Sequence, residues 1–265
     1  MPRRTNSSGK IRNKGALGGI SPRLQPTSIP SRISELLLRF QSMSDALYRR
    51  IEERFGFSMP PEYRRMEARG FFSLDRPAVA WEFMTTGDGP LWLNDMEWLS
   101  LKEIAEFEFD ELYEQRLPHL LPFALNAAGD FWCWQVDKRD VCGTRVLLCP
   151  HDYMLAKVYS PNFASALYRQ ALWWACYDAH PSRIDDDRAF IRRWAIDLAE
   201  VFPASWCQTL VDLANRAPFV WESRWKARIC ENESLLSADE LIKIERRDIA
   251  FSELDTEIQW LFEES

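Results

Sequence analysis

Two short apolar runs near the middle of the chain constrain its fold more than any other feature. Phe131–Val136 and Arg145–Cys149 are rich in aromatic and β-branched residues, and the turn-forming Gly129-Asp130 and Gly143 bound them. Runs of this length and composition are typical of buried β-strands. Asp152–Val158 is a third candidate strand. A sheet is therefore expected at the centre of the chain.

The residues before these strands carry helical signals. Apolar residues between Ile33 and Ile51 recur at helical spacing, which predicts a helix with one buried stripe that ends at Gly56. Pro61 suits the first turn of a short helix that runs to Ala68. Two helices are therefore expected to precede the sheet.

The segment between these helices and the strands adds a hairpin and a third helix. Ala78–Phe83 and Leu91–Leu93 are β-like, and the glycine-containing turn between them favours a hairpin. Ser100 and Glu103 have the spacing of a capping box, in which each side chain accepts a hydrogen bond from the other residue's backbone N–H. This spacing predicts a helix that begins at Leu101.

The rest of the chain reads as helical. One helix follows the strands, because apolar residues from Phe163 to Trp174 share one helical face. After Pro181 only helical patterns remain, among them two apolar stripes and a second capping box at Ser237. The C-terminal residues Ile258–Phe262 read as an amphipathic tail.

These patterns predict an α+β fold in which helices pack against a sheet. Three parts are expected: a disordered basic tail over 1–30, an α+β domain over 31–180, and an all-helical extension over 181–265. The tail is assigned to disorder because it is rich in Gly, Pro, Ser and Asn. A mitochondrial transit peptide is the alternative for this tail, because the tail is basic and lacks acidic residues.

Charge is divided unevenly between the tail and the rest of the chain. The formal net charge is −7, and residues 1–30 hold six basic residues and no acidic one, so residues 31–265 carry −13. Proteins that bind nucleic acid need Lys and Arg facing the phosphates, so an acidic body argues against that function. It favours a basic protein partner instead.

The sequence has no membrane-spanning or secretory pattern. No apolar run reaches 18 residues, and no apolar stretch of signal-peptide length follows the basic N-terminal residues. A soluble, cytoplasmic protein that does not bind membranes is therefore expected. The six cysteines are expected to remain reduced in that compartment.

Catalytic and metal-binding patterns are weak. The P-loop, dinucleotide-binding, nucleophile-elbow and zinc-protease motifs are all absent from the sequence. Cys149 and His151 are a candidate nucleophilic pair, but Pro150 interrupts their strand, so we favour a structural cysteine. Cys133, Cys142, Cys149 and His151 lack the close cysteine pair that is typical of zinc modules. We therefore predict neither enzymatic activity nor a metal or cofactor.

An acidic stretch with interleaved aromatic residues is the strongest candidate for an interaction surface. The stretch runs from Glu97 to Glu114, and Lys102 is its only basic residue. The stretch has two readings. One is a solvated face, and the other is a docking surface on which charge speeds encounter and aromatic residues supply affinity. The candidate partner-binding residues are Glu97, Trp98, Glu103, Glu106, Glu108, Asp110, Glu111 and Glu114.

Four short motifs follow one another in a familiar order. They are Met59-Pro60-Pro61-Glu62-Tyr63-Arg64, Pro122-Phe123-Ala124 with Gly129-Asp130-Phe131, Cys149-Pro150-His151-Asp152, and Phe163-Ala164-Ser165-Ala166-Leu167. They resemble the LP-x-x-Y entry, the F-A-x-x-G-G-D-x-F element, the x-H-D segment and the S-F-x-x-F-L helix of SUKH-superfamily domains, also called the Smi/Knr type. The resemblance covers roughly residues 31–170.

The resemblance implies a mostly antiparallel, curved sheet flanked by helices. Many bacterial SUKH domains are immunity proteins that neutralise secreted polymorphic toxins by direct binding, and fungal relatives are regulatory scaffolds. Fold alone does not determine function. Our leading hypothesis is a cytoplasmic immunity-type protein whose partner is a basic toxin domain. The alternative is a regulatory scaffold of the Smi/Knr type that binds no toxin.

Overall fold

The computed structural model describes residues 44–69, 71–72, 97–109, 113, 116–126, 128–140, 143–178, 184–225 and 228–262. The chain divides into two compact units, Met1–Arg39 and Phe40–Ser265, and all the described residues belong to the second. The tail predicted over 1–30 and the hairpin predicted at Ala78–Phe83 and Leu91–Leu93 lie outside the described residues.

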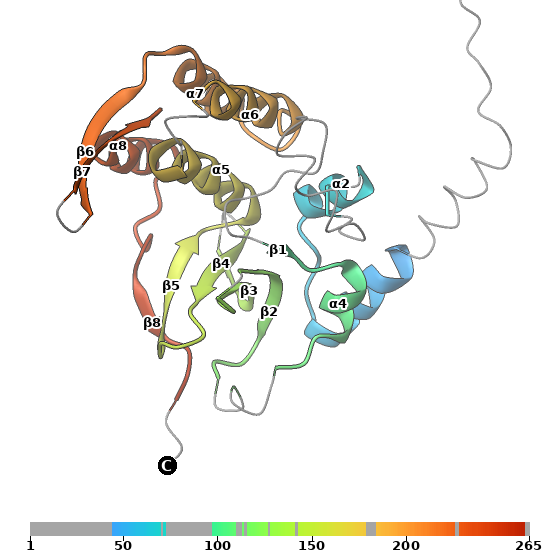
Figure 1. Ribbon diagram of the computed structural model, residues 1–265. Coiled ribbons are helices and arrows are strands. Elements are labelled where there is room, and N and C mark those ends of the chain that lie inside the picture. The colour runs from blue at the N-terminus through green and yellow to red at the C-terminus, as the bar shows by residue number, and fades with distance from the viewer. Residues whose placement is uncertain are drawn as a thin grey trace, which may run out of the picture. The chain divides into compact units, whose positions relative to one another are not determined.

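A six-stranded antiparallel sheet forms the centre of the second unit (Figure 1). The first five strands pair in chain order, and a strand from the C-terminal segment adds the last edge. The strands in spatial order are β1 Glu97–Trp98, β2 Leu120–Leu125, β3 Phe131–Asp140, β4 Gly143–Cys149, β5 Leu155–Ser160 and β8 Glu257–Gln259. This architecture confirms the predicted α+β class.

Both faces of the sheet are covered. On β3, Trp132 and Trp134 enter the larger apolar cluster, whereas Cys133 enters the smaller one. β4 repeats the alternation, with Val146 in the larger cluster and Leu147 in the smaller one. Successive side chains of a strand point to opposite faces, so burial on both sides explains why these strands read as nearly continuous apolar runs.

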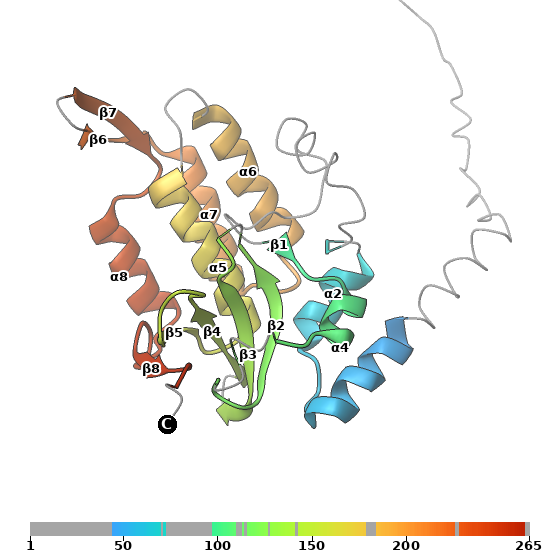
Figure 2. The same ribbon diagram turned by 60° about the horizontal axis from the view of Figure 1, so that its bottom comes forward.

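The helices nearest the sheet, seen beside the strands in Figure 2, bury their apolar residues in the larger cluster. The helical segments are residues 44–55, α2 Pro61–Ala68, α4 Leu101–Glu106, α5 Phe163–Trp173, the π-helical turn η2 Trp174–Asp178, α6 Ile184–Asp197, α7 Ala204–Asn215 and α8 Ala238–Asp248. α5 packs directly against β4 and β5, α4 packs against β2, and α6 packs against α7.

Several helix ends follow the local sequence signals. Gly56 ends the first described helix with a φ of 66°, a backbone conformation that glycine adopts without strain. Pro61 is the first residue of α2. Ser100 and Ser237 form the two predicted capping boxes, at the starts of α4 and α8. These predictions are confirmed because each depends on residues close together in the sequence.

Sequence patterns do not predict β2. The strand contains Pro122, which has no N–H to donate and is unfavourable inside a sheet. The register shifts between Pro122 and Ala124, so a bulge accommodates the proline. Leu121 and Phe123 are fully buried, and their burial between β1 and β3 outweighs the unfavourable proline.

The prediction of an all-helical extension after residue 180 is wrong. β6 (Phe219–Trp225) and β7 (Arg228–Ser234) form a hairpin, and β8 joins the central sheet beside β5. The predicted amphipathic tail at Ile258–Phe262 instead includes most of this edge strand. β8 has three residues and pairs with a strand distant in the sequence, so local periodicity does not reveal it.

A buried ion-pair network fastens the C-terminal segment to the sheet. Arg169 of α5 is almost fully buried, and its Nε donates to Glu245 Oε1 of α8 at 2.8 Å. Its Nη2 donates to both carboxylate oxygens of Asp255, just before β8, at 2.8 and 2.7 Å. Its Nη1 donates to the carbonyl of Tyr159 on β5 at 2.9 Å. One guanidinium therefore joins α5, α8, β5 and the approach to β8.

Candidate functional site

The β6–β7 hairpin forms a small sheet of its own between α7 and α8. Its two strands pair residue by residue from Phe219↔Ser234 to Trp225↔Arg228 without a shift of register. At the base, Leu235 N–H donates to the carbonyl of Ala175 in η2 at 2.8 Å. β6 pairs only with β7 within the described part of the chain. The hairpin is therefore anchored at its base and presents β6 as an edge strand.

One face of the hairpin forms the wall of an apolar groove. Phe219 and Trp221 line the groove and are 44% and 37% exposed, whereas Leu236 on the opposite side is buried. The groove has a volume of about 360 Å³, which is within the range of small-ligand and side-chain pockets. It is lined by Cys176, Phe219, Trp221, Ser234, Leu236, Ser237, Ala238 and Asp239.

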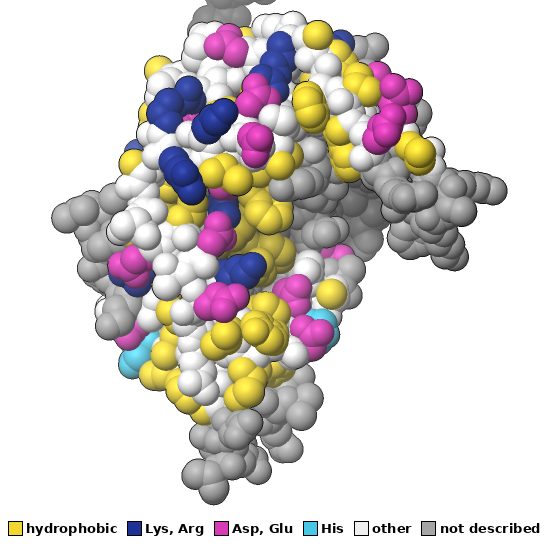
Figure 3. Space-filling view, turned by 90° about the vertical axis from the view of Figure 1, so that its left-hand side faces the viewer, with side chains coloured by type: hydrophobic (Ala, Val, Ile, Leu, Met, Phe, Trp, Pro, Cys, Tyr) yellow, Lys and Arg dark blue, Asp and Glu magenta, His cyan; other side chains and the backbone are white. Residues whose placement is uncertain are grey.

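The opposite face of the hairpin combines exposed apolar and acidic residues. Val220 and Ile229 are 50% and 66% exposed. Glu222 lies directly across from Glu231, and Val220 lies across from Glu233. Figure 3 views the side of the molecule that is on the left in Figure 1, and there hydrophobic side chains lie beside acidic ones. Exposed apolar side chains with a polar rim mark interaction surfaces, and facing carboxylates destabilise a free hairpin.

The acidic stretch predicted as the docking surface loses its aromatic anchors to the core. Trp98 is buried and packs against Phe72 and Phe123, with ring centroids 4.4 and 5.9 Å apart. Phe107 and Phe109 both contact Phe131, at 5.9 and 5.5 Å between centroids. These rings stabilise the fold, and Trp98 is not available to a partner.

The acidic residues of that stretch are placed on separate elements. Glu97 lies exposed on β1, and Glu108 lies exposed after the end of α4. Glu103 accepts from Ser100 N–H at 2.7 Å in the capping box. Glu106 pairs with Arg50 at 3.4 Å. The remaining predicted residues, Asp110, Glu111 and Glu114, lie outside the described residues.

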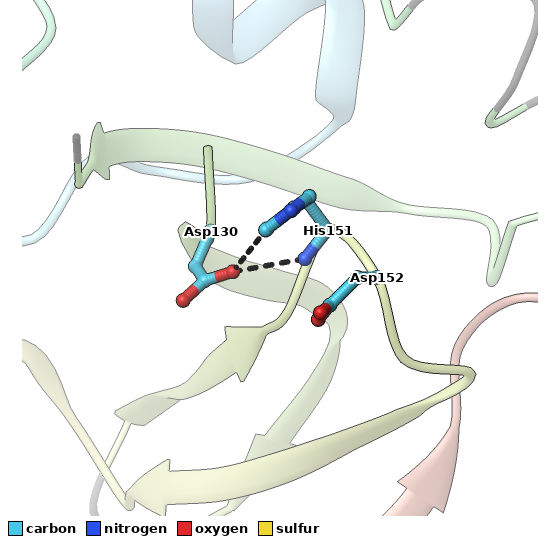
Figure 4. A group of neighbouring side chains, drawn as sticks. All are labelled: Asp130, His151 and Asp152. Atoms are coloured by element: carbon cyan, nitrogen blue, oxygen red, sulfur yellow. Dashed lines mark hydrogen bonds and ion pairs between the residues drawn. The ribbon is translucent and has the colours of Figure 1, made fainter. Parts of the chain in front are cut away.

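One histidine and two carboxylates cluster where the turn before β3 meets the segment after β4 (Figure 4). His151 donates to Asp130 Oδ1 twice, from its backbone N–H at 3.0 Å and from Nδ1 at 2.8 Å. Asn126 Nδ2 donates to the other oxygen of Asp130 at 2.9 Å. Gly129 precedes Asp130 with a φ of 94°. These hydrogen bonds hold the turn before β3 against the segment that follows β4.

The same cluster offers donor atoms to a cation. Asp130, His151 and Asp152 each present one ligand atom, and the three atoms lie within 4.8 Å of one another. His151 and Asp152 are exposed, and the contacts of Asp130 and His151 described above account for their arrangement without an ion. We therefore assign the cluster to the stability of the turn.

The Asp130–His151 pair should contribute fully to the free energy of unfolding only within a limited pH range. The hydrogen bond to Asp130 raises the pKa of His151; burial opposes a low pKa at Asp130, but hydrogen bonds from His151 and Asn126 lower it. Because the pKa of His151 is raised in the fold, its contribution to stability is full below the ordinary histidine pKa and is lost as the pH rises through the raised value. Because the pKa of Asp130 is lowered, its contribution to stability is full above the ordinary carboxyl pKa and is lost as the pH falls through the lowered value. The two conditions overlap between about pH 4 and 6.5.

The variant Asp130→Asn should therefore lower the pKa of His151 toward the unperturbed value, measured by NMR titration of the imidazole ring. Asp152→Asn is the matched control, because Asp152 acts on His151 only through its charge and not through a hydrogen bond. A larger decrease of the His151 pKa in the control than in Asp130→Asn would contradict this account of the turn.

The proposed Cys149–His151 pair is not assembled. Cys149 is fully buried in the smaller apolar cluster with Leu147 and Val158. The His151 side chain is exposed and directed to Asp130. Burial also raises the pKa of Cys133, which lies beside Cys149. The described cysteines of the sheet therefore act as small apolar side chains.

Sequence reasoning misses the hairpin, although one signal could have found it. Phe219, Val220 and Trp221 form a short run of aromatic and β-branched residues after Pro218, a composition that favours a strand. Two flanking helical patterns conceal this short run.

Across the described ranges, no helix is both long and apolar enough to cross a lipid bilayer.

No protein-family model, curated protein or solved structure matches this chain. The resemblance to SUKH domains therefore depends on the order of its short motifs and stays a prediction.

Proposed function

We propose that this chain is a cytoplasmic immunity-type protein that neutralises a basic toxin domain by binding it directly. The observation that carries the proposal is the hairpin surface, where an apolar groove and an acidic, partly apolar face share one edge strand. Aromatic side chains at such a surface supply affinity, and acidic side chains attract and orient a basic partner. The net charge of −13 over residues 31–265 and the order of the SUKH-like motifs support the same proposal.

The proposal moves the docking surface from the predicted acidic stretch to the hairpin. An interface needs large apolar side chains that the free protein leaves exposed. Within the described residues, Phe219 and Trp221 meet this requirement, whereas Trp98 does not. The acidic residues Glu106 and Glu108 then contribute only long-range attraction, which salt screens.

Binding is tested with the purified chain and a candidate basic toxin domain, sought first in the reading frames next to its own gene. We expect a stable complex at equimolar ratio in size-exclusion chromatography, loss of toxin activity in the complex, and weaker binding at high salt. Absence of a complex, or a complex in which the toxin remains active, would contradict neutralisation. Formation of an active complex would instead favour the scaffold hypothesis.

A further inference from the structure

We propose that the hairpin binds its partner by strand addition, and that the added segment is an extended strand of alternating apolar and basic residues. This inference rests on the proposed function, because it specifies which part of a basic partner is recognised. Its evidence is the pairing of β6, the difference between the two hairpin faces, and the distribution of charge along the hairpin.

The edge of β6 is suited to a third strand. β6 has seven residues, and all of them pair with β7 in one register. No described strand occupies its other side. A two-stranded sheet is only marginally stable alone, and an unpaired edge offers backbone N–H and C=O groups to another chain. Peptides that add a strand obtain affinity from these backbone groups and specificity from alternate side chains.

The two faces of the hairpin specify that alternation. Phe219 and Trp221 point to the groove face, while Val220 and Glu222 point to the opposite face. A strand placed beside β6 has the same period of two. Its side chains on one face would therefore meet the apolar groove, and those on the other face would lie beside Glu222 of β6, with Glu231 one strand further away. A segment of alternating apolar and basic residues satisfies both faces at once.

Charge on the hairpin favours a basic segment over a second copy of this chain. Glu222 and Glu231 face each other, and Glu233 lies further toward the base. In the sequence, the basic residues of the hairpin lie near its turn. Two copies that met edge to edge through β6 would bring Glu222 of each close to that of the other. A basic strand would instead relieve the repulsion between Glu222 and Glu231.

The probe for this proposal is a labelled ten-residue peptide of alternating lysine and valine, and its control is a peptide of five lysines followed by five valines. With the full chain, fluorescence anisotropy should show at least about tenfold tighter binding of the alternating peptide, a difference of about 1.4 kcal/mol. Hydrogen–deuterium exchange should show new amide protection in residues 219–225. The affinity of the chain for the alternating peptide should decrease as the salt concentration is raised.

Two matched double variants locate the binding surface. Glu222→Gln with Glu231→Gln should weaken binding of the alternating peptide by about tenfold, because both carboxylates that attract its lysines are then neutral. Glu106→Gln with Glu108→Gln, which also removes two exposed acidic charges, should leave binding unchanged. Circular dichroism and thermal unfolding of both variants show that the fold is retained.

Equal affinity for the two peptides would overturn strand addition, as would protection that appears at residues 97–109 rather than 219–225. A dimer in sedimentation experiments that dissociates on Glu222→Lys would also overturn it, by assigning the edge to a second copy. If the peptide binds as expected but the chain neutralises no toxin, the docking mode stands and the proposed function fails. If the chain neutralises a toxin equally well with both hairpin glutamates replaced, the function stands and this docking mode fails.

Discussion

Arg169→Met should destabilise the protein by about 3–5 kcal/mol, the usual cost of removing one partner from a buried ion pair. Arg169 is 1% exposed and Glu245 is 6% exposed, so the variant leaves a buried carboxylate without its cation. Asp255 and the Tyr159 carbonyl lose their hydrogen bonds as well. The free energy of unfolding in urea, measured against the unchanged protein, gives this difference.

Two further variants separate the network from a general effect of removing an arginine. Arg50→Met is the matched control, because Arg50 forms an exposed pair with Glu106 and should contribute only about 0–1 kcal/mol. Adding Glu245→Gln to Arg169→Met should recover part of the lost stability, since residue 245 then no longer carries a buried charge without its partner. A loss in Arg169→Met no larger than that in Arg50→Met would contradict the role assigned to the network.

Trp260→Ala should destabilise the protein by about 3–5 kcal/mol, as large-to-small replacements of buried aromatic residues do. Trp260 is fully buried in the smaller apolar cluster and stacks on Tyr113, with ring centroids 5.6 Å apart. Its indole N–H donates to the carbonyl of Tyr153 at 2.7 Å. The variant leaves a cavity beneath β5 and β8, which should also increase hydrogen exchange of the β8 amides.

Phe262→Ala is the control for Trp260→Ala, because Phe262 follows the same strand but is 43% exposed. It should change the free energy of unfolding by less than about 0.5 kcal/mol. Similar effects of the two variants would show that the C-terminal segment is not part of the core. That result would contradict the placement of β8 in the central sheet.

The parts of the fold that the sequence predicts are those with local causes. The capping boxes at Ser100 and Ser237 depend on a glutamate in the first turn of the same helix, so a short window contains the whole signal. β3 and β4 are adjacent in the chain, and their aromatic and β-branched residues are buried on both faces. Such signals do not depend on what packs against them.

The parts that the sequence misses depend on partners distant in the chain. β8 is three residues long and is a strand because β5 pairs with it. Pro122 lowers the expectation of a strand at β2, and burial in the centre of the sheet overrides it. Phe219 is exposed and Trp98 is buried because of tertiary packing. Both are large aromatic residues, so residue type does not show which of the two is buried. The candidate docking surface therefore could not be located from composition alone.

The central claim, neutralisation through the hairpin, is tested most directly by cell growth. Cells that express the toxin domain identified by binding are given this chain unchanged, with Glu222→Lys and Glu231→Lys, or with Glu106→Lys and Glu108→Lys. Each double variant changes the same number of exposed acidic residues. We expect protection by the unchanged chain and by the Glu106 and Glu108 variant, and loss of protection by the Glu222 and Glu231 variant at equal protein level. Protection that is retained by the Glu222 and Glu231 variant but lost by the Glu106 and Glu108 variant would contradict neutralisation through the hairpin.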